Sequence, residues 1–152
     1  MGHVQVSRLI PASTGEVYRY LVDLENLSEW LDPSLEADFL NGGPPVLRAQ
    51  TEFQIKFTRF GRTVDSTFRV DEMKPREKFS YRQMQGFFKT WVHTQILSVH
   101  DAKTTLVTDV VEFEMPYGLL GALADDLFVR GDVQRLLQYR LSKVEERFLG
   151  PA

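Results

Sequence analysis

Hydrophobic and polar residues alternate along much of this chain, and a period of two residues is typical of strands that bury one face. The first such run, HVQVSRLI, spans residues 3–10, and Pro11 ends it. The same period returns at Ser34 and continues to residue 115 in six further runs, separated by turn-rich segments such as NGGPP, FGR and KPRE. The pattern therefore predicts seven strands, the last six forming an antiparallel meander with short loops.

Two short helices are predicted between the first and second strands, in the segment PASTGEVYRYLVDLENLSEWLDP, residues 11–33. Ser13 or Thr14 is suited to cap the first helix, and Glu16 lies in its first turn. The apolar residues of the first helix recur at helical spacing and are Val17, Tyr20, Leu21 and Leu24. After a break at residues 23–26, a second short helix ends at Pro33 and carries Leu27, Trp30 and Leu31.

A helical period returns after Pro116 and predicts one long helix from about Gly118 to Phe148. Gly131 lies inside this helix, where a glycine costs about 1 kcal/mol relative to alanine, so we expect a bend or a close contact there. The inward stripe of the helix is expected to consist of Leu120, Leu123, Leu127, Leu137, Leu141, Val144 and Phe148.

The order of elements predicts a single α+β domain over residues 1–152. A curved, seven-stranded antiparallel sheet is expected to wrap around the long C-terminal helix. Because one helix cannot cover the whole concave face of such a sheet, a cavity is expected between them, closed at one end by the two short helices.

Three polar residues share a face with apolar residues in the last predicted hairpin, FFKTWVHTQILSVHDAKTTLVTDVVEFEM, residues 87–115. One register of this hairpin sets Leu97 opposite Val107, Gln95 opposite Asp109, His93 opposite Val111 and Trp91 opposite Phe113. His93, Gln95 and Asp109 then form one cluster on the cavity side, where they can orient a ligand. Two alternatives remain: His93 and Asp109 satisfy each other within a dry core, or the parity of the first strand is inverted and the cluster is dispersed.

Charge and composition narrow the function classes. The net charge is −3 with both signs interspersed, which gives no basic footprint for nucleic acid. No cysteine is present, so disulfides and thiolate metal sites are excluded. No apolar run approaches the roughly 20 residues of a membrane span or resembles a signal peptide, so we expect a soluble, cytoplasmic protein without integral membrane association. The 11 phenylalanines are expected to supply both core and cavity wall.

Other kinds of site are weakly supported. Tyr81 and Gln83 share a parity with Phe79 and can extend the polar rim, although an ordinary strand face is the favoured interpretation. Four acidic residues are interpreted as a solvated face and not as a metal site, because no histidine accompanies them. They are Glu112, Glu114, Asp125 and Asp126. No nucleophile elbow surrounds a serine, and no phosphate-binding glycine loop occurs. Neither a metal nor a cofactor is expected.

Two blocks of sequence resemble the START-like (SRPBCC) superfamily. The block IPASTGEVYRYLVDLENLSEWL from Ile10 is similar to the superfamily's opening of proline, helix and tryptophan-bearing second helix. The block FSYRQMQGFFKTWVHTQILSVHDAKTTLVTDVVEFEMPYGLLG from Phe79 resembles the bacterial polyketide cyclase/dehydrase-like ligand-binding subset. The residues that carry this second resemblance are Gly86, Phe87, Trp91, His93, Asp109, Val111, Phe113, Pro116, Tyr117, Gly118, Leu120 and Gly121.

The resemblance implies a helix-grip fold over nearly the whole chain, with a ligand cavity between sheet and helix. In the polyketide aromatase/cyclases of this superfamily, catalysis is attributed to an arginine with tyrosine, serine or histidine, which orient a poly-ketone and assist enolisation and dehydration. The inward strand faces of this chain offer Ser66, Tyr81, His93 and Asp109 but no arginine, and Arg130 on the long helix is the candidate for that role.

Three hypotheses of function follow. The first is a non-enzymatic binding or carrier domain for a lipid, a quinone or a polyketide-like compound, with the ligand held by Phe53, Ile55, Phe57, Phe68, Tyr81, Trp91, His93, Gln95, Asp109, Val111, Phe113, Leu123 and Leu127. The second is a cyclase/dehydrase-type enzyme in which His93 is the general base and Asp109 orients it. The third is a protein-interaction module with a small or collapsed cavity. A homodimer or another protein partner is left open.

Overall fold

A computed structural model of the chain describes residues 2–116 and 126–150. Within these ranges seven strands form one antiparallel sheet in the order β1-β7-β6-β5-β4-β3-β2. The strands are β1 Gly2–Ile10, β2 Asp38–Leu40, β3 Glu52–Arg59, β4 Arg62–Lys74, β5 Lys78–Gln85, β6 Thr90–Asp101 and β7 Thr104–Glu114. The strand number and the antiparallel pairing predicted from the sequence are confirmed.

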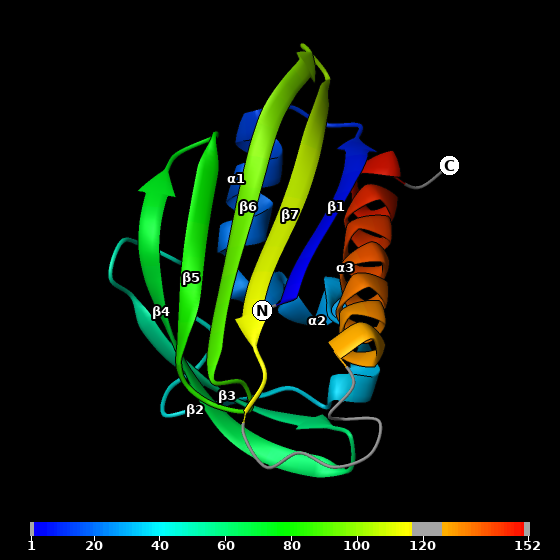
Figure 1. The fold of residues 1–152 in the computed structure, drawn as a ribbon. Coiled ribbons are helices and arrows are strands. Elements are labelled where there is room, and N and C mark those ends of the chain that lie inside the picture. The colour runs from blue at the N-terminus through cyan, green and yellow to red at the C-terminus, as the bar shows by residue number, and fades with distance from the viewer. Residues whose placement is uncertain (1, 117–125, 151–152) are drawn as a thin grey trace.

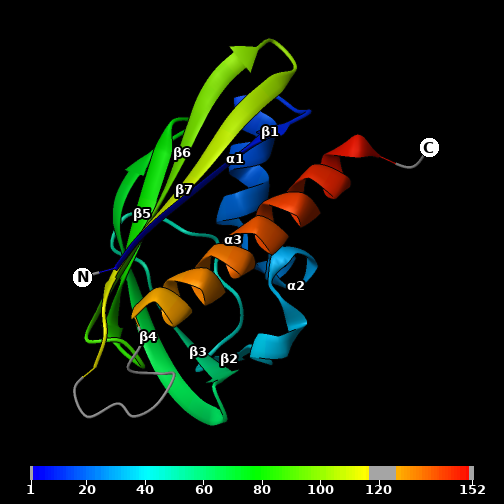
Figure 2. The ribbon, with the colours of Figure 1, turned by 45° about the vertical axis from the view of Figure 1, so that its right-hand side comes forward.

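The short helices follow β1, as predicted. Helix α1, Thr14–Val22, begins with a capping box in which the Ser13 hydroxyl accepts from the Glu16 backbone N–H and the Glu16 carboxylate accepts from the Ser13 backbone N–H. A 3₁₀ turn, η1, Leu24–Asn26, leads into α2, Leu27–Trp30. These short elements lie on the same side of the sheet as the long helix (Figure 2).

The first strand after the helices is shorter than predicted. The sequence pattern gives residues 34–40, whereas the structure has a 3₁₀ turn, η2, at Pro33–Leu35, and β2 covers only Asp38–Leu40. Pro33 is favourable in the first turn of a helix, and the Asp32 carboxylate accepts a hydrogen bond from the Ser34 N–H at 2.9 Å. Local turn chemistry therefore outweighs the period of two in this segment.

The long C-terminal helix, α3, covers Asp126–Leu149 among the described residues and runs through Gly131 without interruption. Its buried apolar residues are Val129, Val133, Leu137, Leu141 and Val144. Leu127 is 74% exposed, so its predicted inward placement is wrong. Leu127 precedes Val129 by two residues, and positions two apart lie on different sides of a helix. The predicted stripe residues Leu120 and Leu123 lie outside the described residues.

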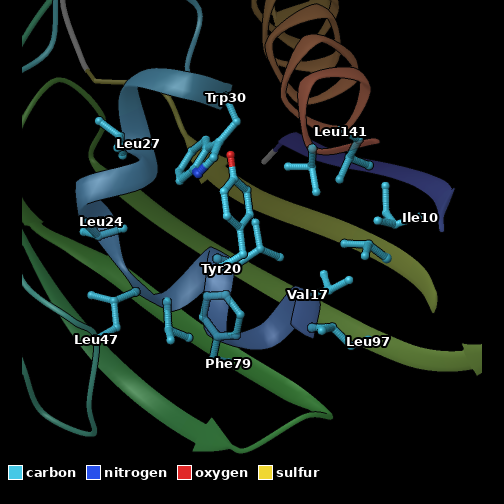
Figure 3. Close-up of a cluster of buried hydrophobic side chains, with 14 of the residues drawn as sticks. Ile10, Val17, Tyr20, Leu24, Leu27, Trp30, Leu47, Phe79, Leu97 and Leu141 are labelled. Carbon is cyan, nitrogen blue, oxygen red and sulfur yellow. The ribbon is translucent and has the colours of Figure 1, made fainter. Parts of the chain in front are cut away.

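The sheet curves, and α3 crosses its concave side (Figures 1 and 2). The main core lies between the sheet, α1 and α2, and includes Ile10, Tyr20, Trp30, Phe79 and Leu141 (Figure 3). A second apolar cluster joins the first half of α3 to β1 and β7 and contains Val4, Val111, Phe113, Val129, Val133 and Leu137. This arrangement is the helix-grip architecture predicted from the sequence.

The register of the last hairpin is also the predicted one. Leu97 pairs with Val107, Gln95 with Asp109, His93 with Val111, and Trp91 with Phe113. His93 and Gln95 are buried, whereas Val92 and Ile96 on the opposite face of β6 are only half-buried. The alternative of an inverted parity is therefore wrong, and the three polar residues do share the concave face.

Candidate functional site

A cavity lies between the concave face of the sheet and α3. The space open to the centres of water molecules inside it is about 170 Å³, whereas one water needs roughly 10–15 Å³ of such space. Its walls come from β3, β4, β5, β6, α2, α3 and the segments between them, and consist of Trp30, Leu31, Leu35, Phe57, Arg59, Phe60, Arg62, Val64, Ser66, Phe68, Tyr81, Gln83, Phe87, Phe88, Trp91, His93, Val133, Leu136, Leu137 and Arg140. A concave, largely apolar wall that is rich in aromatic rings and carries a few polar groups is typical of small-molecule sites.

The predicted wall residues divide into three groups. Phe57, Phe68, Tyr81, Trp91 and His93 line the cavity. The residues that lie behind its surface, in the core or in a buried polar network, are Phe53, Ile55, Gln95, Asp109, Val111 and Phe113. Leu127 is exposed away from the wall, and Leu123 lies outside the described residues.

Sequence reasoning missed the part of the wall that comes from loops and short helices. Trp30 lies on α2, Phe60 at the β3–β4 turn, and Phe87 and Phe88 between β5 and β6. Strand alternation assigns a face only to residues within strands, so it gives no position for these side chains. The Gly-Phe pair at Gly86 and Phe87 was the available signal, because it belongs to the second block of the START-like resemblance.

A connected set of polar side chains, all but one of them buried, lies at the cavity wall. The Tyr81 hydroxyl lies 2.6 Å from His93 Nδ1, and His93 Nε2 lies 3.0 Å from Asp109 Oδ1. Arg140 completes the set, because its Nη1 donates to Asp109 Oδ2 at 2.5 Å and its Nη2 donates to Gln95 Oε1 at 2.5 Å. The predicted cluster of His93, Gln95 and Asp109 therefore exists, but Arg140 holds it together.

Arg140 is the buried arginine that sequence reasoning did not find. It is 3% exposed on α3, and its guanidinium carbon lies 4.6 Å from the centroid of the Trp30 ring. Arg130, the predicted candidate, forms an ion pair with Asp126 at 2.6 Å and does not line the cavity. A signal was present: Arg140 follows Leu137 by three residues and precedes Val144 by four, which places it on the apolar stripe.

The hydrogen bonds fix the tautomer of His93. The Asp109 carboxylate can only accept, so His93 Nε2 carries the proton and donates it to Asp109. Nδ1 is then the acceptor for the Tyr81 O–H. His93 lines the cavity beside Tyr81, and the Tyr81 oxygen keeps its acceptor capacity.

Burial and the neighbouring charges set the ionisation of this network. Burial lowers the pKa of His93 below its ordinary value, against the opposing effect of Asp109. Burial alone would raise the pKa of Asp109, but Arg140 and His93 more than offset it, so that pKa is lowered. Burial raises the pKa of the Tyr81 hydroxyl. At neutral pH the network consists of one ion pair, Asp109 with Arg140, and neutral His93 and Tyr81.

These shifts make stability depend on pH. Because the pKa of His93 is lower in the folded than in the unfolded chain, its contribution to stability is full above about pH 6.5 and is lost as pH falls through the folded value. The lowered pKa of Asp109 also stabilises the folded chain, and this contribution is lost as pH falls below about 3.8. We expect urea unfolding to show a lower free energy of unfolding at pH 5 than at pH 7, and we expect His93→Gln to flatten that difference.

The control for this prediction is His100→Gln, at an exposed histidine near the β6–β7 turn. It should keep the wild-type difference between pH 5 and pH 7. If both variants kept that difference, His93 would not be its origin.

A second charged contact lies at the other end of the cavity wall. Arg59, the last residue of β3, donates from Nε to Asp132 Oδ2 of α3 at 2.9 Å and also from Nη2 to Asp132 Oδ1. Its Nη1 donates to Ser34 Oγ of η2 at 3.2 Å. We call this contact of Arg59 with Asp132 and Ser34 the latch, because it joins three elements that enclose the cavity.

Metal binding and membrane insertion find no support in the described part of the chain. Residues 2–116 and 126–150 contain no group of three histidine, cysteine or acidic side chains arranged to hold a metal ion. No helix in those same ranges has both the length and the apolar character needed to cross a membrane.

Comparisons with known proteins agree with this geometry. A family model described as polyketide cyclase/dehydrase and lipid transport matches residues 1–148. A comparison with curated proteins finds no match. Among solved structures, the protein TTHA0849 from Thermus thermophilus is similar at 22% identity and a TM-score of 0.74, covering 97% of each chain.

Two other solved structures share the fold at lower identity. The Zhui aromatase/cyclase from Streptomyces sp. R1128 has a TM-score of 0.75 and 17% identity over 96% of this chain and 92% of that one. A START superfamily protein from Mycobacterium smegmatis has a TM-score of 0.73 and 15% identity over 96% of each chain. At these identities the likeness extends to the fold alone.

Proposed function

The chain belongs to the polyketide cyclase/dehydrase and lipid transport family, and from this membership we propose that it binds or carries a small hydrophobic molecule with one polar end. The cavity between the sheet and α3 carries this proposal, since its largely apolar, aromatic-rich wall includes residues of a connected polar network. Lipids, quinones and polyketide-like compounds fit that description. The apolar body would lie against Phe57, Phe68 and Trp91, with the polar end near Tyr81 and Arg140.

The apolar wall can supply useful affinity. Burying about 300 Å² of apolar ligand surface contributes about 7.5 kcal/mol at 25 cal/mol per Å². A micromolar dissociation constant corresponds to about 8 kcal/mol, so hydrophobic contact alone falls short once ordering costs are included. Hydrogen bonds at the polar end are therefore needed for binding of that strength.

Native mass spectrometry of the purified protein tests the proposal. We expect a bound species of low mass, which denaturing extraction would release for identification. Protein that carries nothing and whose thermal stability no member of a hydrophobic compound library shifts would count against a binding cavity. The hypothesis of a protein-interaction module, which predicts a collapsed cavity, would then be the one to pursue.

A second candidate function is a cyclase/dehydrase-type reaction in the same cavity. The observation that favours it is the contact between His93 and Asp109, which orients the imidazole as a general base requires. Because the Tyr81 O–H occupies His93 Nδ1, a proton taken from a ligand would pass through the Tyr81 oxygen to that nitrogen. With a compound identified by extraction, His93→Ala should abolish turnover and leave binding largely intact; equal loss of both would favour a carrier.

The latch should slow ligand exchange. Arg59→Ala removes a side chain that joins β3 to α3 and η2 through charge-assisted hydrogen bonds, each of which contributes about 1.5–3 kcal/mol. We expect the release of the neutral fluorescent probe N-phenyl-1-naphthylamine, followed by stopped flow, to be about tenfold faster than in the wild type.

The matched control for the latch is Arg135→Ala. Arg135 contacts the same Asp132 at 3.0 Å but comes from α3 itself and does not bridge to the sheet. Its removal should leave the release rate near the wild-type value. Equal rates in all three proteins would show that the latch does not limit exchange.

A further inference from the structure

Two buried hydrogen-bond donors beside the cavity have no acceptor among the described residues. They are the indole Nε1–H of Trp30 and the Nε–H of Arg140. More than nine in ten buried polar groups in proteins are paired, so two unpaired donors in one place require an explanation. Both side chains line the same cavity, and Arg140 lies over the Trp30 ring. The two donors therefore belong to one contact pair at the cavity wall.

The remaining polar groups at this end leave no net charge for an anion to balance. Arg140 is already paired with the fully buried Asp109 at 2.5 Å, and its other terminal nitrogen is used by Gln95. His93 and Tyr81 bond to each other and are neutral. A carboxylate placed next to Arg140 would also lie close to the Asp109 carboxylate in a poorly solvated site, where like charges repel strongly.

We propose that the polar end of the ligand is an uncharged carbonyl group, whose oxygen accepts hydrogen bonds from Trp30 Nε1–H and Arg140 Nε–H. This inference rests on the proposed function and narrows it. A carbonyl oxygen has two lone pairs and so satisfies both donors without adding charge. The aromatic rings of the wall, which include Phe57, Phe68 and Trp91, favour a body that itself contains rings. Ring-bearing ketones and quinones fit this site, whereas fatty acids do not.

Three probes with one naphthalene body separate the possibilities. Methyl 2-naphthyl ketone presents a neutral carbonyl, 2-naphthoate presents a carboxylate, and 2-ethylnaphthalene presents neither. In isothermal titration calorimetry at pH 7 we expect the ketone to bind about tenfold more tightly than 2-ethylnaphthalene, and 2-naphthoate to bind more weakly than the ketone. Trp30→Phe keeps a ring against Arg140 but lacks the N–H, and should reduce the tenfold ratio of ketone to 2-ethylnaphthalene affinity to about one.

Trp91→Phe is the matched control, because it removes the other indole of the chain from the same cavity. It should change the affinities of the ketone and of 2-ethylnaphthalene by the same factor and keep their ratio. A nuclear magnetic resonance measurement gives a second readout. The Trp30 indole N–H signal, assigned by its absence in Trp30→Phe, should move downfield when the ketone binds and not when 2-ethylnaphthalene binds.

Three results would overturn the inference. Tightest binding of 2-naphthoate would mean that the polar end selects anions. If the protein bound the ketone and 2-ethylnaphthalene with equal affinity, water and not the ligand would satisfy the two donors. That result would reject the inference but not the proposed function. Failure of all three probes to bind would reject the inference together with the proposed function.

Discussion

Replacing Arg140 by leucine is expected to lower the free energy of unfolding by about 3–5 kcal/mol, because it leaves the buried Asp109 carboxylate without its ion-pair partner. Asp109 is 0% exposed, and among the described residues the hydrogen bond from His93 is the one that would remain to stabilise its charge. The same change also deprives Gln95 Oε1 of its donor. Urea unfolding at pH 7, followed by circular dichroism, measures the loss directly.

Two further variants test whether the loss of stability comes from the unpaired Asp109 carboxylate. Combining Asp109→Leu with Arg140→Leu removes both charges, so the double variant should be more stable than Arg140→Leu alone. Arg135→Ala on the same helix removes a side chain that is 66% exposed and should cost less than about 1 kcal/mol. A loss below about 1 kcal/mol for Arg140→Leu would mean that Asp109 is not held as a buried charge.

Ser66→Phe is expected to reduce ligand affinity by about a hundredfold or more, equivalent to about 2.7 kcal/mol, because a ring at this position occupies the cavity itself. Ser66 is 3% exposed on β4 and lies in the wall between Val64 and Phe68. Overpacking costs about 1–3 kcal/mol in a filled core, and the free volume here should reduce that cost. Native mass spectrometry should then show protein that is folded but carries no bound compound.

The control is the same substitution on the opposite face of the sheet. Ser7→Phe places a ring at an exposed position of β1, where the serine bonds only to the Thr108 hydroxyl at 2.9 Å. This variant should keep its ligand. Retention of stoichiometric ligand by Ser66→Phe would place the binding site outside the cavity.

The parts of the fold that were predictable from sequence depend on local rules. Helix capping uses neighbouring residues, so the sequence limited the cap of α1 to Ser13 or Thr14, and the structure has Ser13. The alternation in β6 and β7, with a short turn between them, offered a register in which Gln95 meets Asp109, and that register is confirmed. The START-like resemblance is confirmed by the family model and by the solved structures that share this architecture.

The parts that sequence reasoning missed depend on partners far away in the sequence. A hydrophobicity pattern assigns an arginine to the surface, yet Arg140 is buried because Asp109 and Gln95 satisfy it from strands more than thirty residues away. Trp30 faces the cavity only because α2 packs under α3. Placing Arg140 and Trp30 in the site therefore requires the tertiary structure, whereas the cluster of His93, Gln95 and Asp109 follows from strand alternation.

The pairing of β1 with β7 has a consequence for the synthesis of the protein on the ribosome. Gly2 in β1 pairs with Phe113 in β7. The first strand of the sheet to leave the ribosome therefore cannot pair with β7 until that last strand has been translated. Contacts between such distant segments form late and slowly. The helix that carries Arg140 follows all seven strands in the chain, and no nascent chain has a complete binding wall before α3 is made. The wall of the cavity is therefore complete only after α3 has left the ribosome.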